Sequence, residues 1–377
     1  MFLRYLRKLS TSKDEFDGHQ GRGRKGRERM KAIFFFFFRN ESSHNSCKTP
    51  NITSFPMDYS KFIYQVEPFF LKSGQYIKSN QNLHDQLLNK LDELAVSLRS
   101  DFNRDLIRQS SLLDKLVNIK YHEDIKDLYS ELIRCLANAV ADNDENRKIL
   151  ANNFQFLLTI KEIVDQFDYE KDATNHFEIG KRCYILLRNL YIQDIPQDQL
   201  VKENMMSTFY KYIQNNGQAI ITKWENQYLL DVTKCVFDLI SLFLDDEDLY
   251  NDSKFYDNNI PPYSLFVYLM NEFSLLVAHM KEHFNTDDDE ENDEKNEDYE
   301  EPAILTILVL TSEIVEKLLK KSVQITGEDE SLHSMGLLLT GLGHLENCDV
   351  QFPSKLILLK RFSFIIQCMT SNLSLDL

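Results

Sequence analysis

The chain has 377 residues and a formal net charge of −16, from 43 basic and 59 acidic side chains. An acidic chain argues against nucleic acid or an anionic membrane as the main partner, because both are negatively charged. Only 11 glycines and 8 prolines are present, and this scarcity of turn-forming residues argues against sandwiches, barrels and doubly wound sheets. The composition therefore predicts long helices joined by polar connectors.

The charge is unevenly distributed along the chain. Residues 1–56 carry 12 Lys/Arg and 5 Asp/Glu, which leaves a net charge of −23 for residues 57–377. The first segment contains a G-x-G-x-x-G match at Gly21–Gly26 and five consecutive phenylalanines, Phe34–Phe38. Because no predicted strand or helix flanks these glycines, they do not indicate a dinucleotide site. We expect residues 1–56 to be a disordered basic extension that is not part of the fold. One hypothesis is that this extension is artefactual and that the native protein starts at Met57.

Helical periodicity begins at Met57, and no strand-like alternation is sustained after it. The predicted helices span residues 87–98, 104–119, 125–140, 145–167, 177–192, 198–214, 227–246, 263–284, 303–323 and 353–373. The longest apolar run, Ala303–Leu310, is much shorter than the roughly 18 residues of a membrane span. Six widely spaced cysteines without a Cys-x-x-Cys pair indicate a reducing compartment. We therefore expect an all-α cytoplasmic protein without direct membrane insertion.

An internal repeat appears in the helical region. Leu132–Asn138 and Cys183–Asn189 share a pattern and are each followed by a polar turn, with Asn138 and Asn189 lying 51 residues apart. A fainter third copy begins at Cys235. Helical units near this period predict an armadillo- or HEAT-like α-solenoid.

We expect one armadillo-like repeat domain over residues 57–377. Residues 286–301 are predicted to form a disordered acidic loop inside it, because eleven acids and one lysine occupy residues 287–301. A passive loop is favoured there over a docking site for a basic partner. The helical pattern still runs near Asp376–Leu377, so the array is predicted to be incomplete at its C-terminal end.

Five residues of the repeat are candidates for a partner-binding groove. Asn138 and Asn189 fall where armadillo repeats place an asparagine that binds a partner's backbone, although a buried cap or an inter-helix hydrogen bond is the favoured explanation for them. Asp142, Asp144 and Glu145 belong to the polar turn that precedes the next helix, where acidic residues stabilise the positive helix end. We predict that these five residues contact the partner.

One short motif suggests catalysis. His279-Met-Lys-Glu-His283 matches the H-x-x-E-H pattern of zinc peptidases, and its two histidines share a helix face. The repeat architecture offers no protease context, and histidines in the last turn of a helix also interact favourably with its dipole. The sequence therefore predicts no catalytic residue, no metal and no cofactor, and a zinc metallopeptidase stays the weaker alternative.

Two stretches resemble a known family. Met57–Pro68 looks like the opening of the fungal bud emergence protein four family, and Arg134–Arg147 resembles the armadillo helix and turn of that family and of its animal relative SmgGDS. The resemblance implies a non-enzymatic scaffold that binds Rho-type small GTPases in cell polarity, bud emergence and associated kinase signalling. Such GTPases commonly end in a polybasic segment beside a prenylated cysteine, and an acidic groove would attract that tail. Residues 1–56 have no place in this family.

A second resemblance stays open. Arg188-Asn189-Leu190, followed by a polar turn, is similar to a helix end in fungal armadillo-like proteins of the ataxin-ten type. That resemblance implies another binding scaffold. Binding of Rho proteins with and without their tails would distinguish the two families.

Overall fold

The computed structural model describes residues 58–170, 177–191, 199–223, 226–245, 262–284, 303–320, 328–346 and 353–373. All of them belong to one compact unit, Pro56–Leu377. Every regular element in these ranges is helical and none is a strand, which confirms the predicted all-α class. The predicted basic extension 1–56 and acidic loop 286–301 lie outside the described residues.

The helices of the first half are mostly short. They are α3 (Tyr59–Leu71), α4 (Gly74–Ser79), α5 (Gln81–Ser97), α6 (Asp101–Gln109), α7 (Leu112–Val117), the 3₁₀ helix η3 (Glu123–Ile125), α8 (Lys126–Val140), α9 (Asp144–Ala151) and α10 (Phe154–Asp165). Those of the second half are longer. They are α11 (Phe177–Tyr191), α12 (Gln199–Thr222), α13 (Gln227–Leu244), α16 (Pro262–Phe284), α17 (Ala303–Lys320), α18 (Glu328–Glu346) and α19 (Pro353–Leu373).

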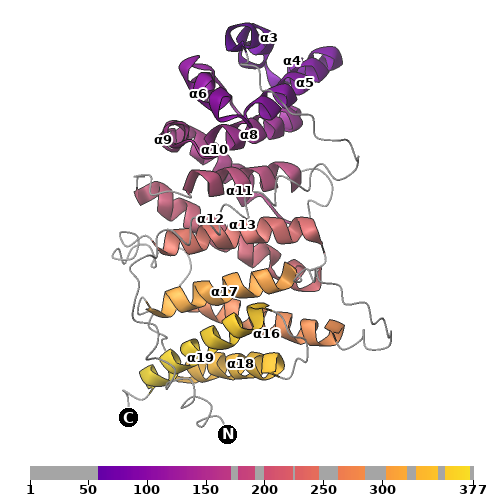
Figure 1. The fold of residues 1–377 in the computed structure, drawn as a ribbon. Helices are drawn as coiled ribbons and strands as arrows, with labels where there is room; N and C mark the ends of the chain where they lie inside the picture. The colour runs from indigo at the N-terminus through magenta and orange to yellow at the C-terminus, as the bar shows by residue number, and fades with distance from the viewer. Residues whose placement is uncertain are drawn as a thin grey trace, which may run out of the picture. The chain divides into compact units, whose positions relative to one another are not determined.

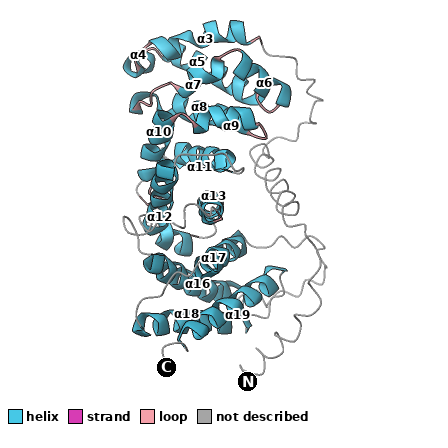
Figure 2. Cartoon of the chain, turned by 90° about the vertical axis from the view of Figure 1, so that its left-hand side faces the viewer, coloured by secondary structure: helices cyan, strands magenta, loops and turns pink. Residues whose placement is uncertain are grey.

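Within this unit the helices stack in chain order and form two layers (Figures 1 and 2). In the first layer α5 packs on α8, α8 on α11, α11 on α13, α13 on α17, and α17 on α19. In the second layer α10 packs on α12, α12 on α16, and α16 on α18. Each second-layer helix also contacts a first-layer helix, so every repeat buries its apolar face against its neighbours. The predicted α-solenoid is confirmed.

Asparagine residues define where several helices begin. The Oδ1 atoms of Asn80, Asn143, Asn153 and Asn226 accept hydrogen bonds of 3.0–3.1 Å from backbone N–H groups in the first turns of α5, α9, α10 and α13. Asparagine is among the best N-capping residues because its side chain satisfies a donor that the helix leaves unpaired. Polar turns between the repeats therefore set the helix boundaries.

Two predicted helices are each divided in the structure. The predicted helix 104–119 is replaced by α6 and α7, because Ser111 adopts a left-handed φ of 55° between them. The predicted helix 145–167 is replaced by α9 and α10, because α9 ends at its C-cap Asn152 and Asn153 caps the start of α10. In both cases the apolar periodicity of the sequence continues across a short break between two helices. Periodicity alone therefore does not reveal the break.

Two other predictions missed helical residues at glycine positions. Helix α18, which contains Gly336, Gly341 and Gly343, was not among the predicted helices. Helix α12 continues to Thr222, well beyond the predicted end at residue 214, and passes through Gly217. Packing against neighbouring helices outweighs the low helix propensity of glycine at these positions.

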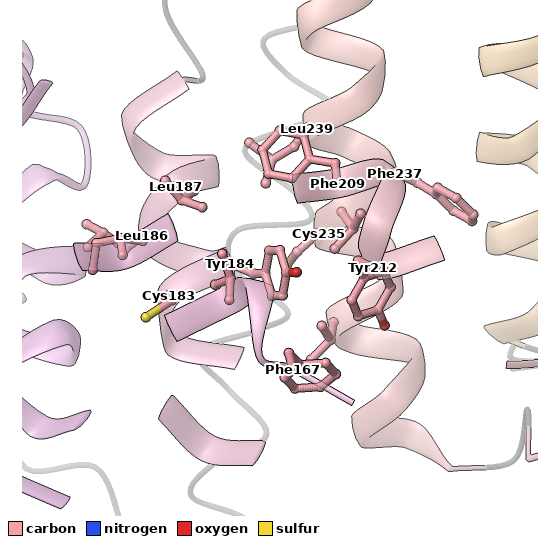
Figure 3. Packing of buried hydrophobic residues seen from close by; sticks show 14 of the residues in the cluster. Phe167, Cys183, Tyr184, Leu186, Leu187, Phe209, Tyr212, Cys235, Phe237 and Leu239 are labelled. Carbon is pink, nitrogen blue, oxygen red and sulfur yellow. The ribbon is translucent and has the colours of Figure 1, made fainter. Parts of the chain in front are cut away.

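The core runs continuously between the layers. Figure 3 shows one part of it, where Phe167, Tyr184 and Tyr212 meet with ring centroids 5.4–6.1 Å apart. Cys183 lies nearby on α11 and is fully buried, as is Cys135 on α8. Burial raises the pKa of both thiols, so they behave as small apolar side chains. None of the described helices is both long and apolar enough to cross a bilayer.

The second layer contains a buried carboxyl oxygen that has no hydrogen-bond partner among the described residues. The Oε2 atom of Glu272 in α16 is buried and has no hydrogen bond among the described residues. Burial raises the pKa of Glu272 to about 7, against an ordinary value of 4.5. The unfolded chain therefore releases this proton at lower pH than the folded chain does, and folding becomes less favourable as the pH rises from 4.5 to 7.

This carboxyl group should make stability depend on pH in a way that its amide analogue does not. We expect Glu272→Gln to be more stable than the parent protein by about 1–2 kcal/mol at pH 7.5, after allowing for the partial exposure of the side chain. Near pH 4 the two proteins should differ little. Urea unfolding at a series of pH values measures the difference, and a gap that does not grow with pH would contradict the assignment.

Candidate partner-binding surface

The structure places Asn138 and Asn189 between first-layer helices, with both side chains buried. Nδ2 of Asn138 donates to the carbonyl of Ala95 in α5 at 2.8 Å, and Nδ2 of Asn189 donates to the carbonyl of Ala137 in α8 at 3.2 Å. Each amide thus satisfies a carbonyl in the last turn of the preceding helix, where no intrahelical donor is available. The inter-helix hydrogen bond is confirmed for both residues, and their binding to a partner's backbone stays a prediction.

The turn that follows Asn138 is held by its own residues. Asp142 has a left-handed φ of 51° and is exposed; aspartate tolerates this conformation better than most residues. Oδ1 of Asn143 accepts from the N–H of Asn146, and Nδ2 of Asn143 donates to the Asp105 carboxylate, both at 3.0 Å. This arrangement fixes the start of α9 against α6 and leaves Asp142 at the surface.

The other two predicted acids lie in the first turn of α9 and are exposed, but both are paired. Asp144 pairs with Arg147, and Oε1 of Glu145 lies 2.7 Å from Nζ of Lys148. The hydrogen bond from Lys148, together with its charge, lowers the pKa of Glu145. Asp142 alone of the three forms no ion pair among the described residues. The corresponding turn after Asn189, residues 193–198, lies outside the described residues.

Arg147 connects this turn to the next repeat. Its side chain is only 3% exposed, and its Nε donates to the carbonyl of Asn189 at 2.9 Å. The same guanidinium pairs with Asp144. The acidic turn after α8 is therefore tied to the end of α11, and the two sites found by the repeat comparison are physically linked.

A row of charged residues crosses the first layer and was missed by the sequence analysis. Arg134 of α8 pairs with Asp92 of α5 and with Glu131 of its own helix. Arg182 of α11 pairs with Glu131 at 2.5 Å and with Glu178 at 2.9 Å. The five residues link three successive helices through alternating charges. We call these five residues, together with the residues of later helices described in the next paragraph, the charged row.

The charged row continues into the later repeats. Oη of Tyr228 in α13 donates to Glu178 at 2.6 Å. Burial alone would raise the pKa of Glu178, but this hydrogen bond and the nearby cations together lower it. Between α17 and α19, Glu313 lies 2.9 Å from Arg361 and 3.4 Å from Lys317. Acids and bases neutralise one another along the row, so its main effect is to join helices.

The 51-residue repeat period of the sequence could have predicted part of the charged row. Glu131 and Arg182 are 51 residues apart, as are Asn138 and Asn189. Equivalent positions of consecutive repeats lie side by side in a solenoid, so opposite charges at this spacing form an ion pair. A comparison of the repeats that looks for similar residues at equivalent positions finds the two asparagines. It overlooks Glu131 and Arg182, because their charges are opposite.

The peptidase motif is placed only in part. His279 and His283 fall in the last turns of α16, but their side chains lie outside those that the structure describes. Among the described residues, no group of three His, Cys, Asp or Glu side chains is arranged to hold a metal ion. The absence of catalytic residues stays a prediction.

Comparison with known proteins gives a family. A sequence model described as the BEM4 N-terminal domain matches residues 57–319. The chain is also 31% identical over 162 residues to the GTPase-GDP dissociation stimulator BEM4 of Saccharomyces cerevisiae, covering 37% of this chain and 26% of that protein. The chain thus spans about a quarter of the relative's length in this match, and no solved structure matches. Since the family model covers well over half of the residues, and the helical solenoid is continuous across them, the chain belongs to the BEM4-like N-terminal domain family.

Proposed function

We propose that this protein is a non-enzymatic regulator of Rho-type small GTPases. The observation that carries the proposal is the match of residues 57–319 to the BEM4 N-terminal domain, together with the relative named as a GTPase-GDP dissociation stimulator. A solenoid suits this role because its stacked helices present an extended surface to a protein partner. The proposed setting is cytoplasmic, in cell polarity, bud emergence and associated kinase signalling, with an architecture of the armadillo kind found in SmgGDS.

The proposed recognition element on the GTPase is its basic C-terminal tail. The acidic turn at the start of α9, with Asp142, Asp144 and Glu145 exposed, is the proposed electrostatic contact. Asn138 and Asn189 are proposed to support the same surface through their inter-helix hydrogen bonds. Charges at a surface contact act mainly on encounter and specificity, so binding should weaken as salt is added.

Binding should depend on the GTPase tail. We expect a GDP-loaded Rho-type GTPase to bind the purified chain, and deletion of its polybasic segment to weaken binding about tenfold in 0.1 M salt, because several exposed charge contacts are lost together. Titration calorimetry with the intact and tail-deleted GTPase measures this ratio. A Ras-type GTPase without a polybasic tail is the matched control.

The outcomes separate the parts of the proposal. Equal affinity for the intact and tail-deleted GTPase would contradict tail recognition and leave GTPase binding intact. Absence of binding to either would contradict the proposed function. Release of labelled GDP, followed with and without the chain, tests whether binding also speeds nucleotide dissociation.

A further inference from the structure

A pocket opens where α7, α9 and α10 meet. It has a volume of about 320 Å³. Its lining residues are Asp114, Val117, Asn118, Ile149, Asn152, Asn153 and Phe154. It lies at the carboxyl end of α9, whereas the acidic turn lies at the amino end of the same helix.

The pocket contains polar groups that have no partner. No ion pair or hydrogen bond reaches the Asp114 carboxylate from the described residues, and the Asn152 side chain likewise has no hydrogen-bond partner among them. Asn118 uses its Nδ2 on the carbonyl of Asp114 at 2.7 Å, which leaves that carboxylate untouched. In contrast, Asp144 and Glu145 at the other end of α9 are both paired with cations. An unpaired carboxylate gains more from a new cation than a carboxylate that must first release one.

The apolar part of the pocket suits the stem of a long basic side chain. Phe154 is 46% exposed at the start of α10, and Val117 and Ile149 complete the wall. The methylenes of lysine or arginine pack on apolar surface while the charged head stays in contact with polar groups. An exposed aromatic ring adds a favourable cation–π contact. The combination with Asp114 therefore fits a cation on an aliphatic stem.

The exposed face of α9 connects the pocket to the acidic turn. Glu145, Lys148 and Asn152 are exposed at spacings of three and four residues and therefore share one face. The eight residues of α9 extend about 12 Å, which about four residues of extended peptide cover. The charge of Lys148 on this face is offset by Glu145 at 2.7 Å. One short basic peptide can thus reach both ends.

We propose that this pocket receives a lysine or arginine side chain of the GTPase tail, with the tail lying along the exposed face of α9. The inference rests on the proposed function for the source of the basic segment, and it adds Asp114, Asn152 and Phe154 as binding residues. Asp114 is the principal contact, because it is the unpaired carboxylate in the pocket.

The test uses a synthetic, unprenylated peptide of a Rho-type polybasic tail, labelled for fluorescence anisotropy, and the full chain. Asp114→Asn should weaken peptide binding about two- to fivefold at 50 mM salt, and Asp114→Lys about tenfold. Glu162→Gln is the matched control, because Glu162 is exposed on α10 and has no ion pair among the described residues. It removes the same charge and should change binding less than about 1.5-fold. Since Asp114 is exposed, thermal unfolding of Asp114→Asn should stay close to that of the parent, whereas Asp114→Lys places a cation in the first turn of α7 and should lower the unfolding temperature slightly.

Each outcome bears on a different statement. If Asp114→Asn and Glu162→Gln weaken peptide binding equally, the cause is a general effect of net charge, and the pocket is not the binding site. Unchanged peptide binding in the Asp114 variants, while the intact GTPase still binds the parent chain, overturns the pocket and leaves the proposed function standing. Tighter binding of a peptide with glutamates in place of lysines overturns the assignment of a cation. Failure of the parent chain to bind the GTPase at all contradicts the proposed function itself.

Discussion

Replacing Gly217 with alanine is expected to lower the free energy of unfolding by about 3 kcal/mol, the upper part of the range for an overpacked core. A Cβ atom added at this position of α12 would lie 1.3 Å from Oη and 2.6 Å from Cζ of Tyr268 in α16. The ring is held in place because its hydroxyl donates to the carbonyl of Ile213 at 2.8 Å. The two helices must separate, or Tyr268 must leave its site.

Urea unfolding of three variants tests this explanation. Gly336→Ala in α18 is the matched control, because nothing lies within 4 Å of a Cβ added there; the higher helix propensity of alanine should stabilise it by up to about 1 kcal/mol. The double variant Gly217→Ala, Tyr268→Leu should recover part of the stability lost in Gly217→Ala. Equal effects of the two glycine substitutions would show that close packing of α12 on α16 is not the cause.

The fold was largely predictable where one long amphipathic segment forms one helix. Helix α19 matches its predicted range, and α11 differs from its predicted range by one residue. The errors occur where local and tertiary preferences disagree. Ser111 adopts a left-handed conformation that is uncommon for serine and that the sequence does not predict. Helix α18 forms in spite of its glycines because the helix as a whole packs on α16 and α19. Family membership was also predictable, from the stretches Met57–Pro68 and Arg134–Arg147.

The candidate site was less predictable, because it depends on which side chains already have partners. The sequence indicated that Asp144 and Glu145 follow a helix end, but it did not show that Arg147 and Lys148 pair with them. It gave no reason to select Asp114, which comes near Asn152 only through the packing of α7 and α9. Net charge is therefore a poor guide to a binding surface in this chain. The relevant quantity is the number of acids that folding leaves unpaired.

Asn146 holds α9 in position, and its replacement by alanine should be the most damaging change in this part of the chain. The side chain is fully buried, and its Nδ2 donates to the carbonyls of Arg104 in α6 at 2.9 Å and Ala139 in α8 at 2.8 Å. Asn146→Ala leaves both carbonyls without this donor and creates a small cavity, and each buried unsatisfied group costs about 1–3 kcal/mol. We expect a loss of about 3 kcal/mol in the free energy of unfolding, measured by urea denaturation.

Asn152→Ala, at the residue that directly follows α9, is the matched control for stability, since its exposed side chain has no hydrogen bond among the described residues. It should change the free energy of unfolding by less than about 0.5 kcal/mol. Because α9 carries both the acidic turn and one wall of the pocket, Asn146→Ala should also weaken binding of the tail peptide under conditions where the variant is still folded. A stable Asn146→Ala protein would mean that water or another donor satisfies the two carbonyls. A destabilised variant with unchanged peptide affinity would separate the binding surface from the anchoring of α9.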